Sequence, residues 1–115
     1  MQKQIPRIKP SQRPKKRYVL FELKTSQKFS FSELSKQLWL AIVKQTGKEE
    51  ALSFGFQLVV FDFKIGRGIF KCRREKCEKA KKAVNSIREF YNAKVFLKTL
   101  RTSGTIKTLK ELLQA

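Results

Sequence analysis

The sequence predicts an α+β domain in which a four-stranded antiparallel sheet carries two helices on one face, with a further helix at the C-terminus. Three observations lead to this fold class: short apolar segments typical of strands, longer segments with helical periodicity, and their succession in the order β-α-β-β-α-β. The chain has 115 residues, 41% of them hydrophobic. It can therefore bury one core, and it is too short for two full domains.

The N-terminal segment differs in composition from the rest of the chain. Residues 1–16 contain all three prolines and many basic side chains, but no acidic one. Proline favours extended backbone, and a segment with so few apolar residues cannot form a core of its own. We therefore expect a flexible basic arm at residues 1–16, followed by a single domain at residues 17–115.

The first strand and the first helix are expected on either side of a short loop. Apolar residues occupy alternate positions of residues 17–24, which is the pattern of a strand with one buried face. Ser30 followed by Glu33 is the signature of a capping box, in which the serine caps the helix and the glutamate side chain returns to the serine amide. Gly47 is expected to end this helix, because glycine readily adopts the backbone conformation that follows the last turn.

A hairpin is expected next. Residues 54–65 predict a long strand with apolar side chains on both faces, residues 66–68 (Gly-Arg-Gly) predict a turn, and residues 69–73 predict the return strand. One face of the long strand should pack against the helices. The other face, through Val59 and Phe61, is a candidate contact surface for a partner protein; the alternative is that the C-terminal helix covers it.

The second half of the domain is expected to repeat the helix-strand pattern. Residues 74–91 predict a helix and residues 93–101 a last strand. In the C-terminal helix, Ser103 is a candidate N-cap and Gly104 is expected at the first helical position. The complete order β-α-β-β-α-β is that of the ferredoxin-like fold, which RRM domains share.

The charge of the chain indicates a polyanionic partner. Lys and Arg number 27 against 9 Asp and Glu, which gives a formal net charge of +18. Neutralising phosphates is the strongest physical reason to carry such an excess, so the sequence predicts nucleic-acid binding. The return strand lacks the paired aromatic positions of RRM domains. We therefore expect contacts with RNA backbone and shape rather than base stacking.

The same composition argues against several classes of function. The chain contains no histidine, which excludes Ser-His and Cys-His nucleophile pairs and histidine-ligated metal sites. Its acidic residues are scattered, so we expect no catalytic residue and no metal site, and we expect Cys72 and Cys77 to be buried thiols. No apolar run is long enough to span a membrane and no signal sequence is visible, so we expect a cytoplasmic protein without a bound cofactor.

Basic and hydroxyl side chains near the first strand, the hairpin and the chain end are candidates for RNA contacts. The most informative segment is residues 101–107, because a helix N-terminus flanked by hydroxyls and cations favours a phosphate. The alternative is that Ser103 only caps the helix. The candidate RNA-binding residues are Arg13, Lys15, Lys16, Arg17, Arg67, Lys71, Arg73, Arg74, Arg101, Ser103, Gly104, Thr105 and Lys107.

Three motifs resemble those of a known family. They are Arg-Pro-Lys-Lys-Arg-Tyr at residues 13–18, Gly-Arg-Gly-Ile at residues 66–69 and Leu-x-x-Ser-Gly-Thr-Ile-Lys at residues 100–107. Together they resemble the ribonuclease P protein component 2 family, the archaeal counterpart of the smaller eukaryotic processing-of-precursor subunit. The resemblance covers about residues 13–113, although residues 26–56 carry no matching motif.

The resemblance implies a role in RNA processing. Ribonuclease P is an endonuclease that removes the 5′ leader of precursor tRNA, and its catalytic subunit is an RNA on which Mg²⁺ is expected. Proteins of this family bind ribonuclease P RNA and work with protein component 3, commonly as a heterotetramer. The residues alone leave alternatives open: a generic RRM-type or ribosomal RNA-binding protein, a small regulatory ferredoxin-like domain, or a metal-dependent nuclease that acts alone.

Overall fold

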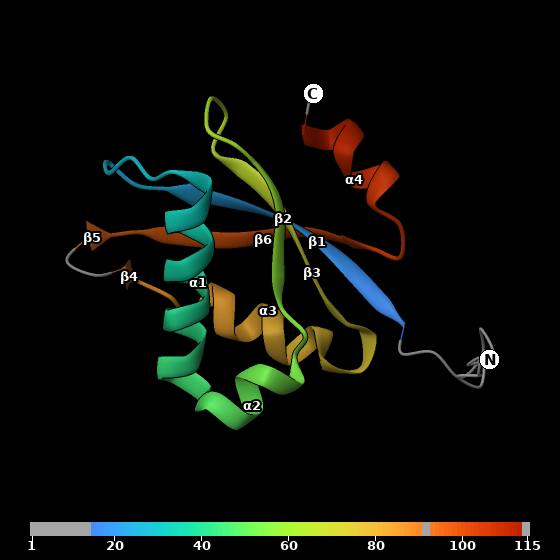
Figure 1. The fold of residues 1–115 in the computed structure, drawn as a ribbon. Coiled ribbons are helices and arrows are strands. Elements are labelled where there is room, and N and C mark those ends of the chain that lie inside the picture. The colour runs from blue at the N-terminus through green and yellow to red at the C-terminus, as the bar shows by residue number, and fades with distance from the viewer. Residues whose placement is uncertain (1–14, 91–92, 114–115) are drawn as a thin grey trace, which may run out of the picture.

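The computed structural model describes residues 15–90 and 93–113, and its elements are labelled in Figure 1. In this part of the chain the elements are β1 (Lys16–Lys24), α1 (Phe31–Thr46), α2 (Lys48–Ser53), β2 (Gln57–Asp62), β3 (Arg67–Arg73), a single-turn 3₁₀ helix η2 (Arg74–Lys76), α3 (Cys77–Asn85), β4 (Glu89–Phe90), β5 (Ala93–Lys94), β6 (Phe96–Ser103) and α4 (Ile106–Leu113). The predicted β-α-β-β-α-β order is present, with α2, η2, β4 and β5 as additions.

The main sheet has four strands in the order β2-β3-β1-β6, and every neighbouring pair is antiparallel. This order confirms the predicted ferredoxin-like topology, in which the two central strands come from different halves of the chain. The two outer strands each contain a bulge: Val59 is the extra residue of β2, and Leu100 is the extra residue of β6. A bulge interrupts the ladder and reverses the facing of the residues that follow it.

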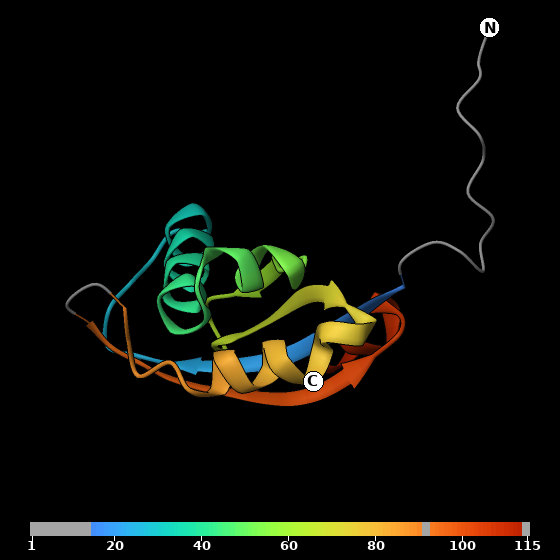
Figure 2. The same ribbon diagram turned by 90° about the horizontal axis from the view of Figure 1, so that it is seen from below.

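The larger core lies between the sheet and the layer of α1, α2 and α3. Figure 2 shows α1 and α2 on one side of β1 and β6. The core is built from the inward positions of β1, from one stripe of α1 and from one stripe of α3, through the buried residues Val19, Phe21, Leu23, Leu34, Leu38, Ile42, Ala80 and Val84. Alternation in the strand and helical spacing in the helices bring these apolar side chains to a common interior.

A smaller core lies on the opposite face of the sheet, beneath α4. Leu109 and Leu113 of α4 are buried together with Leu20 of β1 and Ile69 of β3. Figure 1 shows α4 on the far side of β1 and β3 from α1 and α3. The alternative considered for the outer face of the sheet therefore holds, because the C-terminal helix covers its centre.

The bulge at Val59 corrects the predicted facing of β2. Leu58 and Phe61 both contact the larger core, whereas Val60 packs beside α4. The ring of Phe61 lies 5.9 Å from that of Phe21, centroid to centroid. The prediction that Phe61 lies on the outer face is thus wrong, because strict alternation along residues 54–65 ignored the extra residue.

Helix α1 begins and ends where the sequence predicts. The Glu33 amide donates to Ser30 Oγ at 3.2 Å, and the Ser30 amide donates to Glu33 Oε1 at 2.9 Å, so the capping box is complete. The hydrogen bond from the Ser30 backbone lowers the pKa of Glu33 below its ordinary value of 4.5. Gly47 ends α1 with φ of +88° and leads directly into α2, which the sequence analysis missed.

The second predicted helix is shorter than expected. Regular α-helix runs from Cys77 to Asn85 only, instead of continuing to residue 91. Ser86 Oγ donates to the Lys82 carbonyl at 2.8 Å, and the Arg88 guanidinium donates to the Asn85 carbonyl, so side chains satisfy the last turn. Ile87 is still buried, but it reaches the core from the segment after the helix.

Other boundaries also differ from the prediction; for example, the strand expected at residues 54–65 is the shorter β2. The hairpin turn occupies residues 63–66, so Arg67 and Gly68 belong to β3 rather than to the turn. The last strand is divided into β5 and β6, and β5 pairs with β4 in a separate two-stranded sheet. β1 begins at Lys16, one residue inside the predicted arm, whose first 14 residues lie outside the described part of the chain.

Candidate nucleic-acid interface

Basic side chains gather where β1 begins and where β3 and β6 end. The register places Lys16 opposite Arg73, and it places Tyr18 between Lys71 on β3 and Ser103 on β6. Residues opposite one another in an antiparallel sheet lie about 5 Å apart and share a face. We call this group the basic end; it consists of Lys15, Lys16, Arg17, Lys71, Arg73, Arg74 and Arg101.

Backbone hydrogen bonds fix the geometry of the basic end. The Arg74 amide donates to the Lys15 carbonyl at 2.8 Å, and the Arg73 amide donates to the Phe54 carbonyl at 2.8 Å. Lys16 and Arg73 share the face that carries α4, whereas Arg17 alternates to the face that carries α3. The positive charge therefore wraps around the end of the sheet instead of lying on one face.

The cations of the basic end are free of acidic partners within the described residues. No carboxylate oxygen of residues 15–90 or 93–113 lies within 4.0 Å of a nitrogen of these seven side chains; the ion pairs of this part of the chain all lie elsewhere. Clustered cations repel one another, and a polyanion removes that repulsion. The arrangement suits a row of phosphates.

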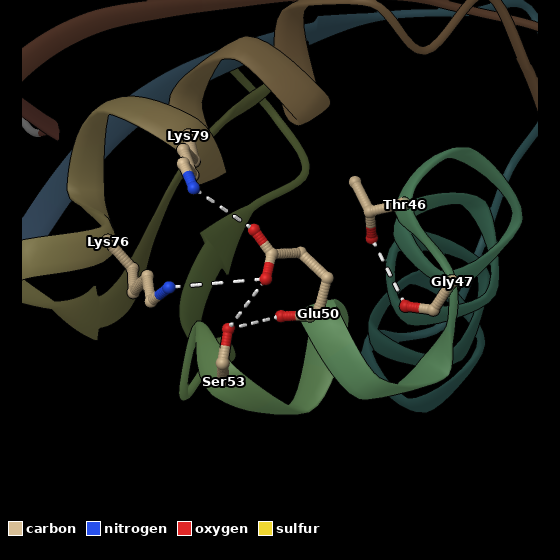
Figure 3. Close-up of polar contacts among 6 residues, drawn as sticks. All are labelled: Thr46, Gly47, Glu50, Ser53, Lys76 and Lys79. Atoms are coloured by element: carbon tan, nitrogen blue, oxygen red, sulfur yellow. Dashed lines mark hydrogen bonds and ion pairs between the residues drawn. The ribbon is translucent and has the colours of Figure 1, made fainter.

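Elsewhere in the described residues, a few basic side chains lie beside an acidic partner. Glu50 of α2 lies between two lysines, with Oε1 4.0 Å from Lys76 Nζ and Oε2 3.4 Å from Lys79 Nζ (Figure 3). Ser53 Oγ donates to the Glu50 carbonyl at 2.6 Å and so holds the residue in place. Exposed pairs of this kind contribute little stability, about 0–1 kcal/mol each, but they leave these lysines less available to a phosphate.

The segment predicted as a helix N-terminus has a different geometry. The Thr105 amide donates to Ser103 Oγ at 3.2 Å, and helix α4 begins at Ile106. Gly104 therefore precedes the helix instead of occupying its first position, and Ser103 forms a local turn with Thr105 just before the helix. A Cβ atom on Gly104 would lie 3.4 Å from Arg17 Nη1, so this segment adjoins the basic end.

The remaining predicted residues divide into three groups. Arg67 lies at the other end of β3, about 20 Å from Arg73 at ~3.3 Å per residue, and its Nε is 3.7 Å from Glu22 Oε2. Lys107 is exposed on the first turn of α4. Arg13 lies outside the described residues. The structure thus separates Arg67 from the other candidates.

One basic residue near this site was missed by the sequence analysis. Lys81 of α3 places its Nζ 3.3 Å from Thr102 Oγ1, beside the end of β6, and 3.1 Å from Glu78 Oε2. Its contact with β6 joins residues 21 positions apart in the chain. No local pattern signals such a contact, and only the stacking of α3 against β6 produces it.

The face of the sheet that RRM domains use for bases is occupied here. Its central positions are Tyr18 and Leu20 on β1 and Ile69 on β3, and all three pack into the core beneath α4. Base stacking on a sheet requires exposed aromatic rings at such positions. The arrangement therefore supports contacts with phosphates at the end of the sheet more than base readout on its face.

The two cysteines lie together, and Cys72 is opposite Arg17 in the sheet. Both are free thiols and both are buried. The hydrogen bond from Cys72 lowers the pKa of Cys77 to about 7, with a contribution from Lys81, and the same bond raises the pKa of Cys72.

Residues 15–90 and 93–113 contain no group of three or more acidic, cysteine or histidine side chains that could hold a metal ion. None of the helices described is long and apolar enough to cross a membrane.

Known proteins are similar to this chain in sequence and in fold. Among curated proteins, ribonuclease P protein component 2 of Pyrococcus horikoshii is 30% identical over 110 residues, covering 96% of this chain and 92% of the relative. The protein of the same name from Archaeoglobus fulgidus is 34% identical over 103 residues, with coverage of 90% and 92%. Among solved structures, a chain of yeast ribonuclease MRP superposes with a TM-score of 0.64 at 8% identity, covering 88% of this chain and 90% of the other.

The family assignment rests on most of the domain. The sequence profile of the Rpp14/Pop5 family matches residues 17–114, a range that includes the basic end from Arg17 onward and the segment before α4. The similarity to the yeast chain supports the fold alone, and that fold has the sheet and helices described above. The chain therefore belongs to the Rpp14/Pop5 family.

Proposed function

We propose that the chain is an RNA-binding protein subunit of ribonuclease P. The observation that carries this proposal is the basic end, where seven cations from three strands and their flanking residues converge without acidic partners in the described residues. The relatives from Pyrococcus horikoshii and Archaeoglobus fulgidus, each aligned over at least 90% of this chain, are both named as a protein component of that enzyme. A net charge of +18 fits a subunit that is surrounded by RNA.

The contribution of the chain would be electrostatic and structural. Bringing RNA helices together places phosphates near one another, and side chains such as Lys16 and Arg101 would neutralise them. The planar guanidinium of arginine can donate two parallel hydrogen bonds to one phosphate, so Arg73 and Arg74 would also fix the orientation of the RNA backbone. The RNA and the Mg²⁺ expected on it would carry out cleavage of the 5′ leader, while the protein stabilises the active RNA fold.

The chain itself supplies no evident hydrolytic machinery. It contains no histidine, and among its carboxylates Glu33 completes a helix cap and Glu50 pairs with lysines. General acid-base or metal-assisted hydrolysis needs such groups to converge. Precursor tRNA would therefore be a ligand of the assembled enzyme and not the substrate of this chain. Protein component 3 is the proposed partner, in a heterotetramer.

A reconstitution assay tests the proposal. The isolated chain should cleave no precursor tRNA in Mg²⁺, whereas adding it to ribonuclease P RNA and the other protein subunits should raise specific 5′-leader cleavage. A reaction with the RNA and the remaining subunits, lacking only this chain, is the control. Specific leader cleavage by the chain alone, or equal cleavage with and without it, would contradict the proposal.

A further inference from the structure

A groove of about 700 Å³ lies at the end of β1 opposite the basic end. One wall is the loop between β1 and α1, and the other is the turn between β2 and β3; both loops lie at the upper left of Figure 1. Its floor and wall include Phe61, Phe63 and Ile65, and its lysines are Lys24, Lys28 and Lys64. No residue of the RNA surface described above takes part in it.

The turn that carries the apolar wall is held rigidly. The Gly66 amide donates to the Asp62 carbonyl at 2.9 Å, and the Lys64 amide donates to Asp62 Oδ1 at 2.9 Å. The Leu23 amide donates to the Gly66 carbonyl at 2.8 Å, which ties the turn to β1. Gly66 has φ of +71°, and a Cβ there would meet the Leu23 carbonyl at 2.9 Å, so the close approach requires glycine.

Large apolar side chains stay exposed on this rigid turn. Phe63 is 50% exposed and Ile65 is 42% exposed. The ring of Phe63 packs edge-on against Phe61 at 4.7 Å, and Phe61 in turn packs against Phe21 of the core. An aromatic side chain that is anchored from below and open above loses little conformational freedom on binding, which is the property of an interface hot spot.

The charges around the groove distinguish a protein partner from RNA. Its lining residues include three lysines but no arginine and no acid, whereas four of the seven residues of the basic end are arginines. Arginine binds phosphate through two parallel hydrogen bonds, whereas lysine is a point charge, and a positive rim around an apolar patch complements a partner that carries carboxylates. Within the described residues, none of Lys24, Lys28 and Lys64 has a carboxylate oxygen within 4.0 Å.

We infer that this groove is a docking site for an acidic segment of a protein subunit. A large apolar side chain of the partner would insert against Phe63 and Ile65, and its carboxylates would pair with Lys24, Lys28 and Lys64. The inference rests on the proposed function only in that the partner is sought among the other subunits of ribonuclease P. The RNA-binding basic end and the protein-binding groove would then occupy opposite ends of β1.

Photo-crosslinking in the assembled enzyme tests this assignment. The full chain carrying p-benzoylphenylalanine in place of Phe63 is reconstituted with ribonuclease P RNA and the other protein subunits, irradiated and then digested with ribonuclease. The expected product is a ribonuclease-resistant crosslink to an acidic peptide of another protein subunit. A crosslink to RNA, or no protein crosslink, overturns the inference. A second probe in place of Lys71 should crosslink to RNA, and its failure to do so would contradict the proposed function. The Phe63 result would still decide whether the groove binds a protein.

Substitutions give a quantitative test with the crosslinked subunit. Phe63→Ser combined with Ile65→Ser should weaken its binding at least tenfold, and Lys28→Glu combined with Lys64→Glu should weaken it and reverse the effect of salt. Leu52→Ser is the matched control, because Leu52 is an exposed leucine on α2, 58% accessible and outside the groove. Unchanged binding of the double serine variant overturns the inference. RNA affinity and the thermal midpoint should stay at wild-type values, which separates loss of docking from loss of fold.

Discussion

The Asn85 side chain pairs with Thr99 through two hydrogen bonds. Asn85 Oδ1 accepts from the Thr99 amide at 2.9 Å, and Asn85 Nδ2 donates to Thr99 Oγ1 at 3.0 Å. Thr99 lies on the outer edge of the sheet, next to the bulge at Leu100. The pair therefore satisfies one backbone amide of this edge strand and connects the last residue of α3 to β6.

Removing the Asn85 side chain should destabilise the domain. Asn85→Ala leaves the partly buried Thr99 amide without its partner, which costs about 1–3 kcal/mol. Urea unfolding followed by circular dichroism measures the change in the free energy of unfolding. Ser86→Ala, at an exposed neighbouring position, is the control and should cost less. Equal stability of Asn85→Ala and wild type would show that water replaces the asparagine at no cost.

Substitutions at the basic end should alter the salt dependence of RNA binding. Lys71→Ala combined with Arg101→Ala removes two phosphate contacts, so the slope of log K against log salt should fall by about 1.4–1.8 in magnitude. Arg67→Ala is the matched control, because Arg67 pairs with Glu22 at the far end of β3. Its slope should stay close to that of wild type. Equal slopes for the double variant and the control would remove the basic end from the RNA interface.

A branched side chain at Gly104 should block RNA without disturbing the fold. Gly104 does not have positive φ, and a Cβ there would make an ordinary contact with Arg17. Gly104→Val should therefore lower RNA affinity on the order of tenfold by excluding a phosphate from the backbone, while the thermal midpoint stays close to that of wild type. Gly68→Ala provides the contrast and should unfold the domain, because its Cβ would lie 2.5 Å from Phe61 Cδ1. Wild-type affinity of Gly104→Val would leave Ser103 with only a structural role.

Truncating the buried side of α4 should destabilise the whole domain. Leu109 is fully buried in the smaller core against Leu20 and Ile69. Leu109→Ala should cost about 2–5 kcal/mol, since it removes a buried leucine and leaves a cavity. Exposure of Leu20 and Ile69 should also raise the binding of a hydrophobic dye. Lys110→Ala, one position away and exposed, is the control. A loss below 1 kcal/mol for Leu109→Ala would mean that α4 is only loosely attached.

The capping box should make the stability of α1 depend on pH. Glu33 has a lowered pKa in the folded chain, so its stabilising effect is complete above its ordinary value of 4.5 and is lost as the pH falls through the lower folded value. Glu33→Gln can keep the hydrogen bond to the Ser30 amide, but it does not titrate. As the pH is lowered below the ordinary pKa of 4.5, the thermal midpoint of wild type should therefore fall more than that of Glu33→Gln. A difference that is constant with pH would contradict this role.

Local signals in the sequence predicted the main strands and helices and the class of partner. Ser30 and Glu33 fixed the start of α1, because both partners of a capping box lie within one helical turn. The faces of β1 followed from alternation, and the order of elements predicted the ferredoxin-like sheet. The excess of cations predicted RNA, since charge is a property of composition and needs no coordinates.

Only the tertiary structure decided which residues act together. The sequence analysis named Arg67 among the candidate RNA-binding residues, but the register of β3 places it near Glu22, away from the basic end. Alternation placed Phe61 on the outer face of the sheet, and the bulge at Val59 moved it to the core. The Asn85 side chain at the end of α3 bonds to Thr99 of β6. Helix α4 covers the outer face of the sheet through Leu109 and Leu113. Such contacts join residues far apart in the chain, and their geometry depends on register and packing, which no short sequence pattern encodes.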